Sequence, residues 1–216
     1  MIGGDQISLA IPTGALLAGS LSLLADSRLA RLNAEELGRQ LLVQEGGLRV
    51  ILVRPSDVPA YVDHGAADLG IVGKDILWET PGSHYELIDL RFGGCRLVLA
   101  VPEASALNGP DTWPPMLRVA TKYPRTAASW FEARGQAVEV VRLHGSVELA
   151  PQVGLVDGIV DLTATGQTLR ANRLRVTAVL GSSTARLIAN QASLKTRTAA
   201  VQSVVSRLRE ASGNAG

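Results

Sequence analysis

The stretch Gly158–Asn172, GIVDLTATGQTLRAN, is the part of the chain that most directly indicates its fold and chemistry. The apolar, β-branched run Gly158–Leu162 predicts a buried strand, and Gln167–Asn172 predicts a helix. Gly166 between them can adopt a positive φ and leaves room for a ligand against the turn. Backbone N–H groups at the start of the helix then converge on one point, which suits an anion. The stretch therefore predicts a strand–loop–helix unit that binds a phosphate group.

The residue types in this loop suit a sugar phosphate. Asp161 ends the predicted strand, where its carboxylate can accept hydrogen bonds from sugar hydroxyls. Thr165 and Thr168 add hydroxyl donors for phosphate oxygens. The alternative is that Thr165 is an ordinary helix cap and Gly166 an ordinary turn residue, because glycine-rich turns after strands are common. The local pattern leaves both interpretations open.

Outward from the loop, short apolar runs alternate with amphipathic or alanine-rich segments along nearly the whole chain. The runs that predict strands are Ile7–Ile11, Arg49–Val53, Leu69–Val72, Glu86–Arg91, Arg96–Val101, Arg118–Ala120, Val138–Leu143, Gly158–Leu162 and part of Ala178–Asn190. The segments that predict helices are Ala15–Asp26, Val58–His64, Lys74–Glu79, Arg125–Arg134, Val147–Leu155, Gln167–Asn172 and Ala192–Ala211. This alternation predicts an α/β fold with mostly parallel sheets and helices on both sheet faces.

One break in composition divides the chain. The segment Glu103–Met116, EASALNGPDTWPPM, is rich in Pro, Gly, Asn and Asp and predicts an exposed connection. We therefore expect two α/β lobes with a central cleft. The expected bounds are 1–95 plus 178–216 for the first lobe and 96–177 for the second lobe, which carries the loop.

Composition excludes several classes of protein. Of the 216 residues, 46% are hydrophobic, which is enough for a full core, and the net charge of +1 predicts neither nucleic acid nor a membrane as a partner. Cys95 is the lone cysteine, which excludes an intrachain disulfide and favours a reducing compartment. Because His64, His84 and His144 are scattered, the sequence predicts no metal cluster.

The N-terminal residues MIGGDQISLAIP lack the basic region of a secretory signal. No apolar run approaches the roughly 20 residues that a membrane-spanning helix needs. We therefore expect a cytoplasmic protein.

Other strand ends carry further candidates for anion binding. Arg54 follows the predicted strand Arg49–Val53, where ligands usually bind in α/β proteins, although a surface salt bridge is the alternative. Gly145 and Ser146 follow another predicted strand. They could line the cleft, or they could merely begin a helix whose first turn holds Glu148.

Two further turns hold candidates. Gly14, in LAIPTGALLAG (Leu9–Gly19), could form an anion-binding turn, but no Lys or Arg lies nearby in the sequence. The two glycines in FGGCRL (Phe92–Leu97) permit a sharp crossing, after which Arg96 could point into the cleft. We expect Cys95 to be a small buried hydrophobic residue, since no adjacent His could activate its thiol.

In this order, these segments resemble the catalytic subunit of ATP phosphoribosyltransferase, the first enzyme of histidine biosynthesis. Together the matches extend over nearly the whole chain, which is far more specific than a lone TGxTL loop. The length resembles that of the short form, which lacks the C-terminal regulatory domain of the long form. The matching stretches are VRPSDVPAYVDHGAADLGIVGKD (Val53–Asp75), YELIDLRFGGCRLVLAVP (Tyr85–Pro102), RVATKYP (Arg118–Pro124), LHGSVELAPQVGLVDGIVDLTATGQTLRAN (Leu143–Asn172) and ARLIANQASLK (Ala185–Lys195).

The resemblance implies two α/β lobes like those of a type II periplasmic binding protein. It implies transfer of the phosphoribosyl group of 5-phosphoribosyl 1-pyrophosphate (PRPP) to N1 of the ATP adenine, with release of pyrophosphate and with Mg²⁺ carried by the substrates. It also implies a homodimer within a hetero-oligomer that includes a histidyl-tRNA-synthetase-like regulatory subunit. Feedback inhibition by histidine would act on that complex.

The resemblance also implies roles for individual residues. No residue is expected to act as a general base, because the adenine nitrogen is already nucleophilic, so positioning and charge stabilisation must dominate. The ribose 5-phosphate end of PRPP would contact Asp161, Thr163, Ala164, Thr165, Gly166, Gln167, Thr168 and Leu169. The ATP and pyrophosphate side would be lined by Gly14, Arg54, Asp68, Gly70, Gly73, Arg96, Gly145, Ser146 and Glu148.

The first loop departs from the pattern of the family. The family usually has a Lys and an Arg around the glycine, in a pattern like PKGR, whereas this chain has Pro12, Thr13, Gly14 and Ala15. Two charge-assisted contacts, each worth roughly 1.5–3 kcal/mol, would be absent. Either another basic residue compensates or the enzyme is slow.

Three other interpretations stay open at this point. A solute-binding module would share the two-lobe fold but would normally carry a signal peptide. A purine-salvage type of phosphoribosyltransferase usually has two adjacent acidic residues before the loop, whereas here Asp161 stands between Val160 and Leu162. A degenerate homologue retained as a binding scaffold would account for the uncharged first loop.

Overall fold

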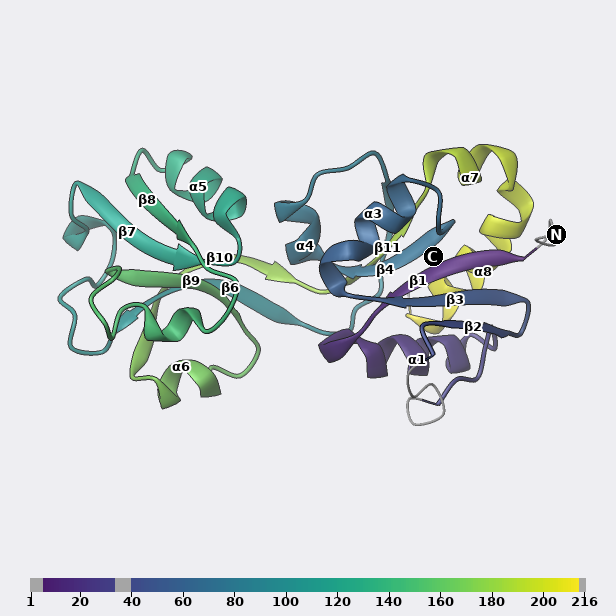
Figure 1. Cartoon of the computed structure of the whole chain (residues 1–216), viewed down its shortest axis with the longest axis horizontal. Coiled ribbons are helices and arrows are strands. Elements are labelled where there is room, and N and C mark those ends of the chain that lie inside the picture. The colour runs from purple at the N-terminus through teal and green to yellow at the C-terminus, as the bar shows by residue number, and fades with distance from the viewer. Residues whose placement is uncertain (1–5, 34–39, 214–216) are drawn as a thin grey trace. The chain divides into compact units, whose positions relative to one another are not determined.

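The computed structural model describes residues 6–33 and 40–213, and the chain divides into two compact units. Unit 1 comprises Met1–Gly93 and Thr184–Gly216, and unit 2 comprises Gly94–Ser183. The chain therefore leaves unit 1 once, builds unit 2 as one continuous segment and then returns (Figure 1).

Unit 1 is built on a mixed sheet of six strands in the order β2-β3-β1-β4-β11-β5. Strand β1 is parallel to β3 and β4, whereas β2, β11 and β5 are antiparallel to their neighbours. The strands are β1 Ile7–Pro12, β2 Leu42–Glu45, β3 Leu48–Val53, β4 Leu69–Gly73, β5 Tyr85–Asp89 and β11 Ala185–Ala189.

Helices cover both faces of this sheet, because side chains alternate between the two faces along each strand. Leu9 and Ile11 of β1 belong to the core that includes the apolar sides of α1 and α8. Ala10 packs in a second core with Val58 and Val62 of α3, and Figure 1 shows α1 and α3 on opposite faces. The helices are α1 Leu17–Asp26, α3 Val58–Asp63, α4 Lys74–Glu79, α7 Gln191–Thr196 and α8 Thr198–Ala211.

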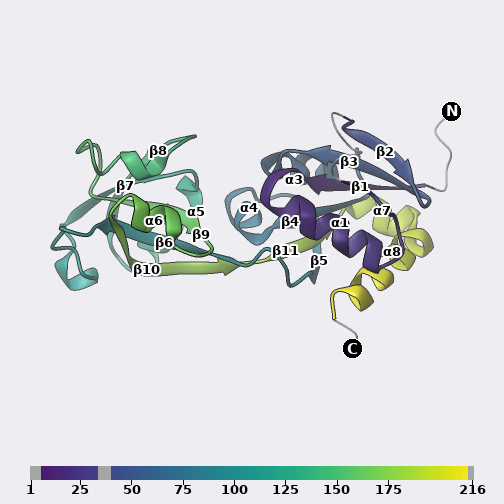
Figure 2. The ribbon, with the colours of Figure 1, turned by 90° about the horizontal axis from the view of Figure 1, so that it is seen from below.

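Unit 2 is built on a mixed sheet of five strands in the order β10-β6-β9-β7-β8. Strand β7 is parallel to β8 and β9, whereas β6 is antiparallel to β9 and β10. Figure 2 shows α6 in front of this sheet, and its buried Leu169 packs in the core there. The elements are β6 Cys95–Pro102, β7 Met116–Thr121, α5 Pro124–Glu132, β8 Ala137–Arg142, β9 Gly158–Thr163, α6 Gln167–Ala171 and β10 Leu174–Ser183.

The expected α/β architecture is confirmed, but the sheets are mixed rather than mostly parallel. The sequence does not predict β2, since this strand is short and largely exposed. Strand β10 begins at Leu174 rather than near Ala178, and it pairs along β6 as far as Ser183. Residues 178–183 therefore belong to unit 2, not to the first lobe as expected.

Two expected helices differ in the structure. Val147–Leu155 forms only a short 3₁₀ helix, Val147–Leu149, followed by turns, because Pro151 has no N–H to continue a helix. The segment Ala192–Ala211 is broken into α7 and α8 at Arg197, whose φ of −128° is not helical.

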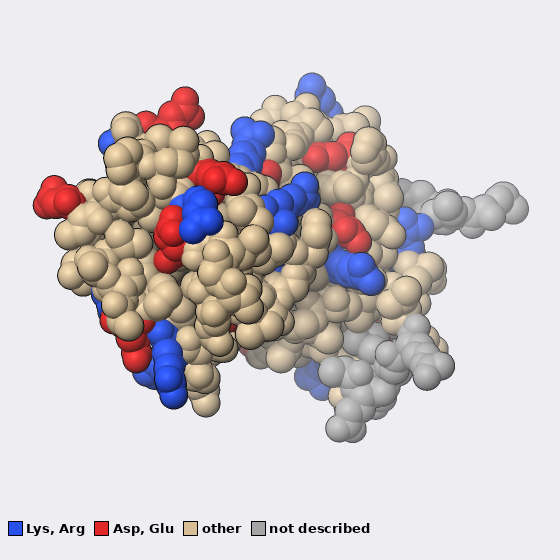
Figure 3. Space-filling model, turned by 60° about the vertical axis from the view of Figure 1, so that its left-hand side comes forward, with Lys and Arg blue, Asp and Glu red and all other residues tan. Residues whose placement is uncertain are grey.

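The surface carries charges of both signs. On the face in Figure 3, Lys and Arg side chains stand in small groups beside Asp and Glu side chains, without a large field of one sign. In residues 6–33 and 40–213, no helix is both long enough and apolar enough to span a lipid bilayer.

Candidate functional site

In unit 2, three adjacent parallel strands end at the same edge of the sheet. The registers of β7 place Thr121 opposite Val160 of β9 and Arg142 of β8. Lys122 and the loops that follow β8 and β9 therefore lie together at this edge. Ligands of α/β proteins bind at the carboxyl ends of parallel strands, so this edge is where a site is expected.

A pocket of about 210 Å³ lies at this edge. One lining residue comes from the 3₁₀ helix after β8, and the others come from the end of β9, the following loop and α6. The structure thus brings the whole loop predicted from the sequence around one small cavity. The lining residues are Glu148, Asp161, Leu162, Thr163, Ala164, Thr165, Gly166, Gln167, Thr168 and Leu169.

The turn at the centre of this loop depends on Gly166. Its φ of +75° lies in the left-handed region that favours glycine, and its N–H donates a 2.9 Å hydrogen bond to Thr163 Oγ1. The Gln167 N–H donates to Thr165 Oγ1 at 3.3 Å, so Thr165 does support the turn, as the capping interpretation holds. The N–H groups of Thr165 and Thr168 meet no acceptor within the described residues, which leaves them available to an anion.

Asp161 has an unusual electrostatic environment in this pocket. Burial raises the pKa of the Asp161 carboxyl above its ordinary value of 3.8, and the Glu148 carboxylate raises it further. The Leu162 N–H and the Lys122 ammonium act in the opposite direction without cancelling the rise. A carboxylate in this state gains from a ligand hydroxyl that donates a hydrogen bond to it.

Two exposed basic residues flank the pocket. Arg96 lies directly opposite Thr163 on the neighbouring antiparallel strand, so the two side chains project from the same face of the sheet. Lys122 follows β7 and lies near enough to Asp161 to oppose the rise in its pKa. The sequence interpretation missed Lys122, although its place just after a predicted strand, in RVATKYP, was a usable signal.

The turn after β8 contributes less than expected. Gly145 and Ser146 are exposed and do not line the pocket, whereas Glu148 does. Ser146 stands at the N-terminus of the 3₁₀ helix, but its hydroxyl makes no capping hydrogen bond; its carbonyl accepts the Leu149 N–H.

Unit 1 has a comparable edge, where β3, β1 and β4 end side by side. The Thr13 N–H donates a 2.8 Å hydrogen bond to the Val53 carbonyl, and Gly14 then adopts a φ of +79° with open space around it. Arg54 follows Val53 and is exposed, and its side chain has no hydrogen bond or ion pair in the part of the chain that the structure describes. The Arg54 guanidinium at this edge is therefore available to bind an anion.

Asp68, which was expected on the nucleotide side, instead holds unit 1 together. Its buried carboxylate accepts hydrogen bonds from the Ser8 N–H at 2.8 Å and the Ser8 hydroxyl at 2.7 Å. It also accepts 2.7 Å hydrogen bonds from the Ser193 hydroxyl and the Arg197 guanidinium. Burial raises the pKa of Asp68, but these four contacts outweigh it and hold the pKa below the ordinary value. Such a carboxylate is not available to a ligand.

Gly70 also has a packing role rather than the expected ligand contact. A Cβ at this position would lie 2.8 Å from methyl groups of Val58 and Val62, so only glycine lets α3 pack this closely on β4. Gly73 lies at the carboxyl end of β4, where a Cβ would collide with the carboxylate of Asp75.

Comparison with known proteins relates this site to an enzyme family. The family model HisG, ATP phosphoribosyltransferase, matches residues 54–210. An ATP phosphoribosyltransferase of Rubrobacter xylanophilus is 48% identical over 201 residues, which cover 92% of this chain and 93% of the relative. One of Moorella thermoacetica is 45% identical over 218 residues, which cover 98% of this chain and 96% of the relative.

Solved structures agree with this relationship. The ATP phosphoribosyl transferase (HisG:HisZ) complex from Thermotoga maritima contains a chain with a TM-score of 0.81 and 31% identity, over 97% of this chain and 100% of that one. The periplasmic aliphatic sulphonate binding protein SsuA from Escherichia coli has a TM-score of 0.62 at 16% identity, over 97% of this chain and 69% of that one. At that identity the likeness shows the fold alone, and it confirms the expected similarity to periplasmic binding proteins. Given the family match and the near-full coverage of its relatives, the chain belongs to the ATP phosphoribosyltransferase family.

Proposed function

We propose that this enzyme of the first step of histidine biosynthesis binds the ribose 5-phosphate end of PRPP in the pocket formed by Asp161–Leu169. The observation that carries the assignment is that unpaired backbone N–H groups, threonine hydroxyls and the carboxylates of Asp161 and Glu148 surround a single pocket at the carboxyl edge of parallel strands. The N–H groups and hydroxyls suit the phosphate, and Asp161 suits the hydroxyls of the ribose.

In the proposed reaction, N1 of the ATP adenine attacks the anomeric carbon of PRPP. The new N–C bond forms while the C–O bond to pyrophosphate breaks, and pyrophosphate leaves with the bonding electron pair. Positive charge builds up on the ribose ring in between, and in this proposal the Asp161 carboxylate stabilises that charge. Arg96 and Lys122 flank the pocket and balance the negative charges of the phosphate groups. The protein thus acts by positioning and electrostatics, and no general base is needed.

The Mg²⁺ that such a reaction uses fits an ion carried by the substrates. Magnesium usually keeps several waters and binds through one or two carboxylates together with substrate phosphates. Asp161 and Glu148 are two carboxylates on the same pocket, so the residues present suit such an ion. The described residues include no group of three or more His, Cys, Asp or Glu residues arranged to hold a metal by themselves.

The ATP and pyrophosphate side is proposed to include Gly14, Arg54 and Gly73 at the carboxyl edge of the unit 1 sheet. Arg54 supports this assignment because its guanidinium is exposed and unpaired among the described residues at a strand end. Asp68 and Gly70 are left out of the proposed site, since both are engaged inside unit 1.

Steady-state assays of phosphoribosyl-ATP formation from PRPP and ATP, with and without the regulatory subunit, test this assignment. Arg54→Met is expected to raise the KM for ATP about 10-fold and to raise the KM for PRPP less, since a lost charge-assisted contact costs roughly 1.5 kcal/mol. Lys195→Met is the matched control, because Lys195 is a cation of unit 1 in the last turn of α7. A rise in the KM for PRPP alone would show that the two substrates have been assigned to the wrong edges.

We also infer that the chain assembles as a homodimer within a hetero-oligomer, with a histidyl-tRNA-synthetase-like regulatory subunit. The Thermotoga maritima relative is a HisG:HisZ complex, which supports this assembly. Co-expression of both chains followed by size-exclusion chromatography with light scattering should give one species that contains both. Separate elution of the two chains at micromolar concentration would contradict the inference.

A further inference from the structure

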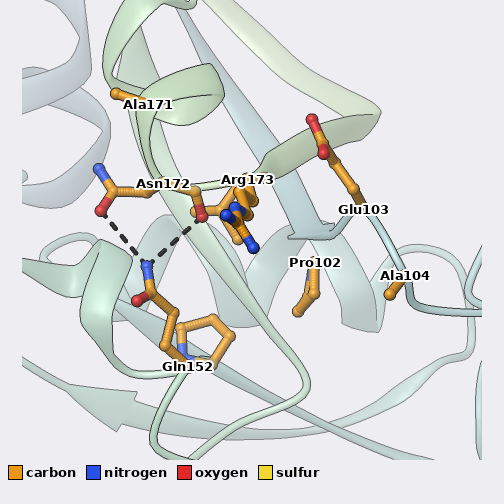
Figure 4. Close-up of a pocket in the computed structure, with 9 residues that line it drawn as sticks. Pro102, Glu103, Ala104, Gln152, Ala171, Asn172 and Arg173 are labelled. Atoms are coloured by element: carbon orange, nitrogen blue, oxygen red, sulfur yellow. Dashed lines mark hydrogen bonds between the residues drawn. The ribbon is translucent and has the colours of Figure 1, made fainter.

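A second cavity of unit 2, of about 620 Å³, lies beside α6 and beside the segment that carries Glu148 (Figure 4). Its wall contains two carboxamide side chains, Gln152 and Asn172, which face each other and are joined by hydrogen bonds. Gln152 belongs to the turns after the 3₁₀ helix, and Asn172 follows the last residue of α6. The cavity wall therefore includes a contact between two segments that are 20 residues apart in the sequence.

The hydrogen bonds of this pair reach two residues of the pocket that is proposed to bind PRPP. The Gln152 Nε2 group donates to the Asn172 carbonyl at 3.4 Å and to Asn172 Oδ1 at 3.3 Å, and it lies 3.5 Å from the carbonyl oxygen of Glu148. The Asn172 Nδ2 group in turn donates a 2.9 Å hydrogen bond to the Thr168 carbonyl. Glu148 and Thr168 both line the pocket assigned to PRPP. One chain of hydrogen bonds thus joins the two elements between which the ribose phosphate would lie.

We infer that Gln152 and Asn172 are positioning residues for PRPP: they fix α6 and its loop against the segment that carries Glu148. The inference rests on the proposed PRPP site. Neither residue lines the phosphate pocket, so each would act through Thr168 and Glu148 rather than by contact with the substrate.

A merely structural role for this pair is less consistent with the packing. Val147, Ala150 and Leu169 are buried and form one core, which already holds the 3₁₀ segment against α6. Gln152 is exposed and its hydrogen bonds are long, so they add little to the stability of that core. They can, however, favour one placement of α6 relative to the 3₁₀ segment, because the apolar contact between the two elements is not directional. Loss of the pair should therefore change substrate binding more than folding.

Gln152→Met tests this inference, because methionine keeps the length of the side chain and removes both donor and acceptor. In the full chain with its regulatory subunit, we expect the KM for PRPP to rise about 2- to 10-fold, the size of one modest hydrogen bond. The KM for ATP should stay within 2-fold, and the Tm should be nearly unchanged. Gln136→Met is the matched control, because the Gln136 side chain donates to the carbonyls of Pro114 and Ala137 elsewhere in unit 2.

Asn172→Ala and the double variant complete a thermodynamic cycle. If the pair acts as a unit, the double variant should raise the KM for PRPP less than the product of the two single effects. Full additivity of the two changes would overturn the inference, as would equal changes in both KM values or an equal effect of the Gln136→Met control.

Thr168→Ala, measured in the same assay, separates this inference from the site on which it rests. If Thr168→Ala raises the KM for PRPP and Gln152→Met does not, the site stands and the positioning role is wrong. If Thr168→Ala leaves PRPP binding unchanged, the assignment of the pocket is wrong, and the positioning role of Gln152 and Asn172 is then wrong as well.

Discussion

Asp68 directly precedes β4 of unit 1 and Asp161 lies within β9 of unit 2, and the environments of these two carboxylates are opposite. Asp68 accepts hydrogen bonds from Ser8, Ser193 and Arg197, and its pKa is held below the ordinary value despite burial. Asp161 has lost water without gaining comparable partners, and burial raises its pKa. The difference teaches that a carboxylate with filled hydrogen-bonding capacity stabilises the fold, whereas a buried one with few partners and a raised pKa is a candidate for ligand binding.

Asp68→Asn is expected to have the largest effect, a loss of about 3 kcal/mol in the free energy of unfolding at pH 7, because Arg197 would lose its counter-charge. The folded pKa of Asp68 lies below the unfolded value, so its stabilisation is present above pH 3.8 and is lost as the pH falls below it. Urea unfolding at pH 7 and pH 3 should show the gap between wild type and variant narrowing in acid. Normal stability with lost activity would indicate that Asp68 contacts a substrate rather than stabilising the fold.

Asp161→Asn should lower activity without lowering stability. We expect kcat/KM for PRPP to fall about 100-fold, since a charged hydrogen bond to the ribose is worth roughly 1.5–3 kcal/mol. The Tm at pH 7 should rise, because a carboxyl with a raised folded pKa destabilises the fold once the pH exceeds 3.8. Asp111→Asn, at an exposed position of the same unit, is the control. A lower Tm at pH 7 would mean that Asp161 has a structural role like that of Asp68.

The loop beside Asp161 should respond to smaller changes in the same direction. Gly166→Ala would place a Cβ 3.0 Å from the Arg170 guanidinium at a positive φ, and it should raise the KM for PRPP about 10-fold with little change for ATP. Gly154→Ala is a control, because Gly154 has a similar φ of +73° in an open turn outside the pocket. Equal losses for both substrates would show that the loop does not bind PRPP.

The loop Thr13–Ala15, at the carboxyl edge of the unit 1 sheet, lacks the two basic residues usual in the family, and adding them tests whether this edge binds an anionic substrate. Thr13→Lys combined with Ala15→Arg restores the pattern usual in the family, and we expect kcat to rise about 5-fold, less than the roughly 1.5–3 kcal/mol per contact would allow, because exposed side chains lose entropy on binding. Rapid-mixing or steady-state assays with the regulatory subunit present would measure the change. Unchanged or lower activity would indicate that this edge does not need the two charges.

The smallest expected effect is a shift in pH dependence. PRPP affinity should fall as the pH falls toward the raised pKa of Asp161, because the protonated carboxyl no longer accepts from the ribose hydroxyls. Lys122→Met should move this loss to higher pH, since Lys122 opposes the rise in the pKa that burial and Glu148 produce. Calorimetric titrations at a series of pH values from 3.8 upward would measure the midpoint. Lys122→Arg should keep the wild-type midpoint, and a shift that persists in an Asp161→Asn background would refute the coupling.

Local chemistry explains which features could be predicted from the sequence. The loop after β9 was predictable because its strand, glycine and helix are adjacent in sequence, and the structure shows Gly166 with a positive φ directly before α6. The positions of most strands followed from short apolar runs. The helix expected at Val147–Leu155 was wrong because Pro151 has no N–H with which to continue the helix.

The roles of Asp68 and Lys122 depend on long-range pairing, which the sequence does not display. Asp68 meets Ser8, Ser193 and Arg197, all at least 60 residues away along the chain. Lys122 lies beside Asp161 only because β7 and β9 pair in one particular register. From the residues alone, a carboxylate before a strand is equally consistent with a ligand and with an internal anchor.

The placement of β11 has a consequence for biosynthesis of the protein. This strand lies between β4 and β5 in the sheet of unit 1, yet it is made after the whole of unit 2. While the chain is being synthesised, β4 and β5 each lack a neighbour that both need, and their apolar residues Ile71 and Ile88 are left without their final packing. Unit 2 is continuous and can fold first, so the nascent chain carries an unfinished N-terminal half with unpaired strand edges until Ala185–Ala189 leaves the ribosome.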